Sequence, residues 1–444
     1  MRDSKPPDIP EQHRPIRPGN WLPEDHRVHR AWLQQTVKDS DSTPKDFHPE
    51  IQEMKELIEN DTRMRLLVET MFSQISSKKV YQQNPAGERQ VRDYQHMLEL
   101  MNHLMTTAPS YSEKENQVGL VGLPFHAIFD WPMGTASGFA VFLDLQFNAA
   151  LKKILDAWGR FLMTEASADV LGDGLSGWLG PVGKKDLTQT ANLATGTRRT
   201  FEETYECDPE KKNHGFTSWD DFFTRKYKEG VRPVASPDDD DIISNACESQ
   251  PYKVAHNVEA HAKFWIKGQP YSITDMLAHH ALAPHFVGGT IYQAFLSALS
   301  YHRWHAPVTG RIVSIHLVPG TYFSEPPFTG FQDAEGIAMD GVNSGQEYLT
   351  ALATRALIFI EADNAAIGLM CVSMIGMVEV STCDVTVKEG QQVAKGEELG
   401  MFHYGGSSHC LLFREGVNVM GFPDTGRTTN VPVRSKVGHV VRKT

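Results

Sequence analysis

The sequence FHYGGSS, residues 402–408, places two glycines directly before two serines. Glycine tolerates strained backbone conformations and leaves its own carbonyl uncrowded. The hydroxyl of Ser407 can therefore attack the carbonyl carbon of Gly406 and convert the peptide bond into an ester. Elimination and hydrolysis would then cut the chain at this point and leave a pyruvoyl group on residue 407. Because GGSS also occurs in many flexible loops, this interpretation needs support from the rest of the chain.

Such an attack needs a base, and the usual activator of a serine hydroxyl is a histidine oriented by a carboxylate. The sequence YHRWHAP, residues 301–307, supplies His302 and His305, and ACES, residues 246–249, supplies Glu248. We expect His305 and Glu248 to form this pair. Two alternatives remain for the histidines: a hydrogen-bonded structural pair, and a zinc site, although no third ligand follows at a recognisable spacing.

A pyruvoyl ketone has a defined use in enzymes. It condenses with the amine of an amino acid and accepts the electrons released when CO2 leaves, as pyridoxal phosphate does in other decarboxylases. The expected cofactor is therefore a covalent pyruvoyl group derived from Ser407. The expected ligand is a small-molecule amino acid.

The composition disfavours some partners. The chain has 43 Lys and Arg against 55 Asp and Glu, which gives a formal net charge of -12. Nucleic acids and anionic membrane surfaces attract clustered basic residues, so we expect neither as a partner. The longest apolar run, residues 367–378, is too short to cross a bilayer, and the first residues lack the apolar core of a secretory signal. We therefore expect no stable membrane insertion.

The cysteines point to a reducing compartment. There are 5 of them, widely scattered and without a CxxC pair. An odd, scattered set indicates neither a disulfide framework nor a structural zinc site. We expect a cytoplasmic protein that holds no metal.

The composition of the chain and the spacing of its apolar residues change along its length. Residues 1–24 are rich in proline and predict a flexible tail. Residues 25–165 carry apolar side chains at spacings of three and four, as at Ile51, Met54 and Ile58, and predict a helical N-terminal domain. Residues 166–215, rich in Gly, Asp, Thr and Lys, are expected to form a loop-rich connector. Short strand-like runs dominate residues 216–444, so the predicted fold class is α+β.

Four segments of this last region resemble motifs of the phosphatidylserine decarboxylase family. They occur in the family's order and are DFFTR at 221–225 with Arg232-Pro233, FWIKG at 264–268 with Tyr271-Ser272, YHRWHAP at 301–307, and the block from Val387 to Ser408. The last of these resembles the family's processing motif. The resemblance implies a β-rich catalytic domain that cuts itself between residues 406 and 407, so that the two resulting chains are each other's partners.

The resemblance also implies roles for individual residues. Ser407 would become the pyruvoyl group, and Gly406 would become the C-terminus of the larger chain. His305 would be the base for cleavage, and His302 would act in decarboxylation. Glu248 stands where the family usually has Asp, so its assignment as the carboxylate that orients His305 depends on a longer side chain.

The turn around the cleavage point also departs from the family pattern. Gly405 and Ser408 would form the supporting loop, and Ser408 stands where Thr is usual. Gly376-Met377 occupies the position of the family's Gly-Ala strand. His409 follows the serines where the family tends to be apolar, and the sequence does not decide its role.

These departures resemble a subgroup, the phosphatidylserine-decarboxylase-like L-tryptophan decarboxylases. The shared text includes ACES at 246–249, GTYF at 320–323, FIEADN at 359–364 and DAWG at 156–159. The subgroup implies a free aromatic L-amino acid as substrate, with L-tryptophan first. The alternative is a phosphatidylserine decarboxylase that makes phosphatidylethanolamine.

Two further alternatives lie outside this chemistry. Residues 389–400 resemble the hairpin of biotinyl and lipoyl carrier domains, but the modified-lysine text of those domains is missing. The chain could also be a degenerate relative that never cleaves. A denaturing gel separates these cases, because only a self-processing enzyme gives two chains.

Overall fold

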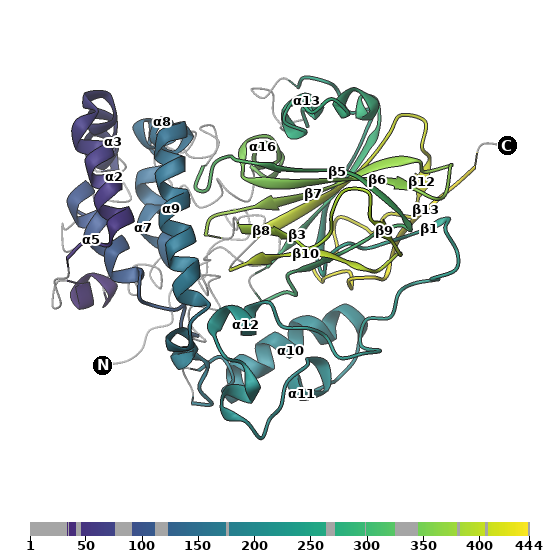
Figure 1. The fold of residues 1–444 in the computed structure, drawn as a ribbon, viewed down its shortest axis with the longest axis horizontal. Coiled ribbons are helices and arrows are strands. Elements are labelled where there is room, and N and C mark those ends of the chain that lie inside the picture. The colour runs from purple at the N-terminus through teal and green to yellow at the C-terminus, as the bar shows by residue number, and fades with distance from the viewer. Residues whose placement is uncertain are drawn as a thin grey trace.

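The computed structural model describes residues 33, 35–40, 46–75, 91–111, 123–174, 177–262, 271–297, 299–324, 345–379, 382–404 and 407–442. The predicted tail, the FWIKG segment, Gly405 and Gly406 lie outside these residues. Helices fill the N-terminal part of the described chain and antiparallel strands fill the C-terminal part (Figure 1). The predicted α+β fold class is therefore confirmed.

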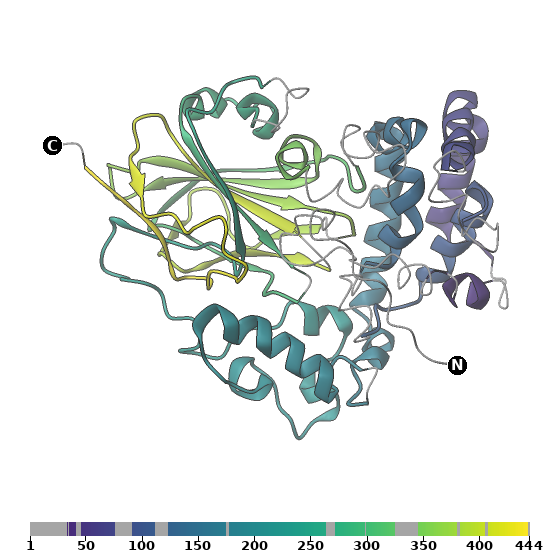
Figure 2. The ribbon, with the colours of Figure 1, turned by 180° about the vertical axis from the view of Figure 1, so that it is seen from behind.

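The N-terminal helices stand side by side next to the main sheet (Figures 1 and 2). They are α2 (Pro49–Asn60), α3 (Thr62–Ile75), α5 (Tyr94–Leu104), α7 (Pro124–Met133), α8 (Ala136–Leu143) and α9 (Leu145–Leu162). Two breaks between them have the same cause. Asp61 accepts hydrogen bonds from the N–H groups of Arg63 and Met64, and Asp144 does the same for Gln146 and Phe147. Each aspartate thus begins a new helix by capping it.

The expectation of loops over residues 166–215 was wrong. This region contains the short helices η3 (Glu165–Leu171), α11 (Phe201–Thr204) and η4 (Lys212–Gly215), and a 15-residue helix, α10 (Pro181–Thr195). Proline in the first turn of α10 suits its start, and Gly196, with φ of 68°, ends it. Leu187, Ala191 and Ala194 form its buried stripe. The polar composition concealed this helical spacing. Helix α12 (Trp219–Phe223) follows and is capped by the Ser218 hydroxyl, which accepts the N–H of Asp221.

A seven-stranded antiparallel sheet forms the centre of the C-terminal part. Its strand order is β2 (Gln250–His256), β3 (Thr290–Leu296), β11 (Ser407–Phe413), β7 (Leu369–Gly376), β6 (Arg355–Ala362), β5 (Gly310–Val318) and β9 (Gln392–Val393). Strand β11 is buried at every position. It pairs with β3 on one side and with β7 on the other.

Successive side chains of β11 point to opposite faces of this sheet. Leu411 and Phe413 join one hydrophobic core, and Cys410 and Leu412 join the other. We call the first side the small-sheet face, because Trp304, Phe402 and Val437 of two small sheets belong to its core. These sheets are β4 (Arg303–His305), β10 (Glu398–His403) and β8 (Thr382–Val385), and β1 (Ile242–Ser244), β13 (Lys436–Val440) and β12 (Val419–Met420).

We call the opposite side the helix face. Its core continues without a break from the sheet into the N-terminal helices. It also includes residues of α13 (Ile273–Met276), η5 (Ala283–Phe286) and α16 (Gln346–Leu352). None of the helices in the described ranges is long and apolar enough to cross a membrane.

The N-terminal helices reach the predicted cleavage segment. Trp158 of α9 packs against Tyr404, with 5.5 Å between ring centroids. A Cβ atom added to the next residue, Gly159, would lie 1.8 Å from the Tyr404 hydroxyl. Glycine is therefore needed for this approach, and the residue two positions before Gly406 rests directly on the N-terminal helices.

Candidate functional site

The three chemistry-bearing segments of the sequence meet around strand β4. His305 donates its backbone N–H to the carbonyl of Ala246 at 2.9 Å, which joins the YHRWHAP and ACES segments. On its other side β4 pairs with β10, and Phe402 donates its N–H to the carbonyl of His302 at 3.0 Å. Strand β10 then leads through Tyr404 and the two glycines to Ser407. Backbone pairing thus brings together segments that lie up to 160 positions apart in the sequence.

Ser407 is the first residue of β11, between Leu296 of β3 and Gly376 of β7. It lies on the same side as His409 and Leu411, the small-sheet face, where β4 and β10 also lie. Its side chain is fully buried, and its hydroxyl has no hydrogen-bond partner among the described residues. A buried hydroxyl usually has such a partner. Ser407 therefore presents, on the side of the histidine motif, a hydroxyl that has no partner among the described residues.

Ser408 points the other way. Its hydroxyl accepts a hydrogen bond from Gln293 Nε2 at 3.3 Å on the helix face. Gln293 in turn accepts one from the Tyr271 hydroxyl at 2.6 Å. The two adjacent serines are thus distinguished by the pleat of the strand, and only Ser407 faces the histidine side.

His305 is oriented by a backbone carbonyl. Its Nδ1 lies 3.0 Å from the carbonyl oxygen of Gly396, and Arg434 donates from Nε both to this nitrogen and to the same carbonyl. Nε2 lies 3.3 Å from the Tyr301 hydroxyl. Burial, and after it the charge of Arg434, lower the pKa of His305 to about 3. The imidazole is therefore neutral at neutral pH and able to accept a proton.

Glu248 does not orient His305, contrary to our expectation. Its two oxygens accept hydrogen bonds from Arg232 at 2.9 and 2.5 Å, and Oε2 also accepts the N–H of Val433 at 2.8 Å. Burial opposes the charge of Arg232, but these hydrogen bonds outweigh it and raise the pKa of the guanidinium. A buried arginine needs such a partner, and Arg232 therefore occupies the carboxylate that the sequence suggested for His305.

His302 lies in a row of aromatic rings. It stacks on Phe223 with 4.1 Å between centroids, Phe223 stacks on Trp219 at 5.0 Å, and Trp219 lies 6.4 Å from Tyr404. The register of β4 on β10 sets His302 beside Phe402, whereas His305 lies opposite Glu398. Along β10, His302 is thus nearer than His305 to the end that leads to Ser407.

The backbone is strained on both sides of Ser407. Tyr404 has φ of 52° and Val378 has φ of 50°, a conformation that costs L-residues roughly 1–3 kcal/mol and is unusual for a β-branched side chain. Tyr404 immediately precedes the glycine pair, and Val378 follows the strand that pairs with Ser407. Strain of this kind concentrates at functional sites.

Two histidines beside Ser407 received no role from the sequence. His403 contacts Asp220 at 2.8 Å and Asp384 at 3.5 Å; burial opposes its charge, but these carboxylates raise its pKa. His409 lies on the small-sheet face, is fully buried, and has no hydrogen-bond partner at either nitrogen among the described residues. Burial lowers its pKa to about 3, so it is neutral. Its position two residues after Ser407 was the signal that could have identified it.

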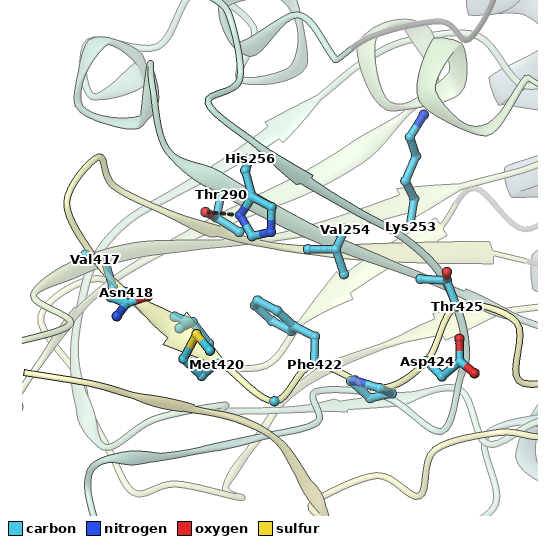
Figure 3. Close-up of a pocket in the computed structure, with 13 residues that line it drawn as sticks. Lys253, Val254, His256, Thr290, Val417, Asn418, Met420, Phe422, Asp424 and Thr425 are labelled. Carbon is cyan, nitrogen blue, oxygen red and sulfur yellow. Dashed lines mark hydrogen bonds between the residues drawn. The ribbon is translucent and has the colours of Figure 1, made fainter.

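Among the described residues, no group of three His, Cys, Asp or Glu side chains could hold a metal ion. A surface hollow of about 510 Å³ is lined by Lys253, His256, Thr290 and residues 417–425 (Figure 3). Thr290 pairs with Phe413, the last residue of β11, whereas Ser407 is its first residue. A strand of this length places its two ends about 20 Å apart. The hollow therefore lies away from Ser407, the residue at which the chemistry is predicted.

Comparison with known proteins gives two family matches. A family model described as phosphatidylserine decarboxylase matches residues 219–438, and a second with that description matches residues 48–187. Decarboxylase iboD of Amanita muscaria is 46% identical over 299 residues, which are 66% of this chain and 84% of that protein. An L-tryptophan decarboxylase of Psilocybe cyanescens is 36% identical over 410 residues, 89% of this chain and 88% of that protein. Phosphatidylserine decarboxylase proenzyme 3 of Schizosaccharomyces pombe is 32% identical over 204 residues, 46% of this chain and 19% of that protein.

The ion pair of Arg232 and Glu248 leads to a stability prediction. Glu248→Gln should lower the free energy of unfolding by about 3–5 kcal/mol, because it leaves a buried guanidinium without a countercharge. Glu53→Gln is the matched control, since Glu53 forms an exposed pair with Lys153, and it should cost less than about 1 kcal/mol. Denaturant titration of both variants measures the difference. Equal losses would show that the buried pair does not hold this region together.

Proposed function

The chain belongs to the phosphatidylserine decarboxylase family and is a decarboxylase, and we propose that its substrate is a free aromatic L-amino acid, L-tryptophan first. The match to L-tryptophan decarboxylases supports this proposal because it extends over most of both chains. The match to the phosphatidylserine decarboxylase proenzyme of S. pombe covers less than half of this chain. Conversion of phosphatidylserine to phosphatidylethanolamine is the alternative.

We further propose that the cofactor is a pyruvoyl group made from Ser407. The observation that supports it is the buried Ser407 hydroxyl, unpartnered among the described residues, at the head of a central strand and on the face of the histidine motif. When present, this ketone binds the substrate's amine and takes up the electrons that CO2 leaves behind. Gly406, the other residue of the proposed cleavage site, lies outside the described residues.

The proposed proton acceptor for cleavage is His305, whose buried ring is neutral and lies between the Tyr301 hydroxyl and the Gly396 carbonyl. Glu248 would then influence the position of His305 indirectly. It holds the N–H of Val433, and the following Arg434 donates from Nε to the Gly396 carbonyl at 2.9 Å, the same carbonyl that orients His305. His302, stacked on Phe223, is proposed to take the proton from the substrate's ammonium group, which must be neutral to react with a ketone.

The side chains around Tyr404 fit an aromatic substrate. Trp158, Trp219 and Phe223 form a ring-lined wall beside the turn that leads to Ser407. Aromatic faces attract one another beyond their hydrophobic contact, by about 0.5–1.5 kcal/mol per pair. An indole side chain would gain from such a wall, whereas a phospholipid headgroup would not.

After the proposed cleavage the two chains would remain together. The small chain, residues 407–444, contains β11, which is hydrogen-bonded to β3 and β7 along its whole length. It also contains β13, which pairs with β1 of the large chain, and β12, which pairs with β13. The new terminus at residue 407 would therefore stay fixed between two neighbouring strands.

The two serines give a direct test of the cleavage site. Ser407→Ala should remain a single chain of 49.7 kDa, because no hydroxyl remains to attack Gly406. Ser408→Ala is the matched control and should still be cut, since its hydroxyl faces Gln293. A denaturing gel and intact mass of freshly purified protein distinguish the outcomes. Cleavage of the Ser407 variant, or uncut wild-type protein with full activity, would contradict the proposal.

The two histidines should differ in phenotype. His305→Ala should accumulate as uncut precursor, because the base for cleavage is lost. His302→Ala should still be cut but decarboxylate about 10²–10⁴ times more slowly, the usual cost of removing a proton-transfer group. The fraction of cut chain on a gel and the rate of amine release measure the two effects separately. If the phenotypes were exchanged, His302 would be the base for cleavage and His305 would act in decarboxylation. The register of β4 on β10, which sets His302 nearer to the end that leads to Ser407, would then explain the result.

The substrate class is tested with a panel of L-tryptophan, L-phenylalanine, L-tyrosine and phosphatidylserine vesicles. We expect tryptamine from L-tryptophan without added pyridoxal phosphate. Mass spectrometry of the amine products provides the measurement. Turnover of the vesicles with no amine from any free aromatic amino acid would replace the proposal with the alternative function.

A further inference from the structure

Glu379 follows the end of β7, the strand that pairs with Ser407. It is three residues beyond Gly376, the register partner of Ser407, and is fully buried. Its Oε1 accepts the backbone N–H of His126 in the first turn of α7 at 2.8 Å. Its Oε2 has no hydrogen-bond partner among the described residues. A buried carboxyl oxygen without a partner is costly, so its presence just after the strand that pairs with Ser407 calls for an explanation.

A second chain of contacts leads from the region of Glu379 to Tyr404. Phe125, which precedes His126, packs edge-on against Trp158 with 5.1 Å between centroids. Trp158 packs on Tyr404, two residues before Gly406. Glu379 thus lies where α7 meets the end of the sheet, and the aromatic wall proposed for the substrate connects it to the cleavage turn. The strained residue Val378 immediately precedes it.

The surroundings of Glu379 favour its neutral form. Burial raises its pKa to about 8, and the backbone N–H groups of His126 and Phe125 oppose this only in part. Among the described residues, titratable side chains on the segments that contact this region include His126, Tyr322 and Tyr404. Burial raises the pKa of both tyrosines, so neither carries a charge near neutral pH. The carboxyl group is therefore an acid with a proton to give.

We propose that Glu379 is the catalytic acid that protonates the α-carbon of the substrate. This proposal rests on the proposed function. The bond between the α-carbon and the carboxylate breaks, CO2 leaves without the bonding electron pair, and that pair stays on the α-carbon side. The α-carbon then takes the proton from Oε2 of Glu379. A proton from the next substrate's ammonium group, or from water, restores the acid.

The start of α7 suits the carboxylate that this step produces. Its first N–H groups carry the positive end of the helix dipole, which stabilises a negative charge placed there. Helix α7 has no side-chain cap from its own N-cap residue, Leu123. A purely structural interpretation therefore treats Glu379 as a cap supplied from the sheet. It accounts for Oε1 but not for the buried Oε2, since a glutamine would cap the helix equally well without an acidic group.

Glu379→Gln separates these interpretations. Glutamine keeps an acceptor for the His126 N–H but has no acidic proton. We expect normal self-cleavage and a normal reactive carbonyl on the small chain, a nearly unchanged KM, and a kcat reduced about 10²–10⁴-fold. Glu203→Gln is the matched control, because Glu203 also accepts a backbone N–H at a helix start, from Thr200, but is exposed and lies outside the family motifs. Its kcat should equal that of the wild type.

The pH dependence provides a readout that a structural cap would not change. The acid must be protonated, so kcat of the wild type should fall as the pH rises through about 8, and Glu379→Gln should lose this fall. A variant kcat within about twofold of the wild type would overturn the proposal. If the variant fails to cut itself, the wild-type profile decides, and a kcat that stays level from pH 7 to 9 would overturn it.

Failure of the proposed function would look different. In that case the wild-type enzyme, after it has formed the reactive carbonyl on residue 407, would release no amine from aromatic amino acids but would act on phosphatidylserine. The same variants are then assayed on that substrate, because protonation of the α-carbon is required there too. A loss of kcat confined to Glu379→Gln would support the acid, and equal kcat values would overturn it.

Discussion

The pairing of β11 with β3 and β7 is the constraint on which the site depends. It fixes Ser407 at the head of a fully buried strand, with neighbours on both sides. The pleat of that strand decides which of two adjacent serines faces the histidine motif. The same hydrogen bonds would keep the small chain in register once the peptide bond before Ser407 is broken. A reactive carbonyl at this position would therefore be held by the fold itself.

Other parts of the structure hold His305 and Tyr404 in place. On one side, Arg232 and Glu248 hold the segment from Val433 to Arg434, and this segment touches the carbonyl that orients His305. On the other side, α9 comes so close to Tyr404 that Gly159 cannot carry a side chain without displacing it. The N-terminal helices are thus part of the wall around the site. This agrees with the match of residues 48–187 to a second model of the same family.

Local patterns in the sequence predicted more than the long-range pairings. The helices in residues 49–75 and 94–104 followed from apolar spacing, and the α+β class followed from the order of helices and strands. The convergence of the segments containing His305, Glu248 and Ser407 followed from the reaction they would perform together. The partner of Glu248 could not be predicted, because Arg232 reaches it through a turn whose course depends on the packed fold. Helix α10 was missed because polar composition outweighed the spacing of Leu187, Ala191 and Ala194.

Glu379 shows another limit of sequence reasoning. In the sequence it is one acidic residue at the end of an apolar run, and only the packing of α7 against the end of the sheet makes it a buried acid. His409 is similar, since nothing in the sequence decided between a buried and an exposed ring. In both cases the chemistry of the side chain depends on which surfaces exclude water from it.

The central claim is that residue 407 becomes the carbonyl that binds the substrate. Borohydride reduction in the presence of L-tryptophan, followed by tandem mass spectrometry of the separated chains, tests it most directly. The expected result is a small chain that begins at residue 407 and carries the substrate's amine, or its decarboxylated product, on that residue through a stable carbon–nitrogen bond. An adduct on a lysine instead, or an uncut chain with no adduct, would contradict the claim.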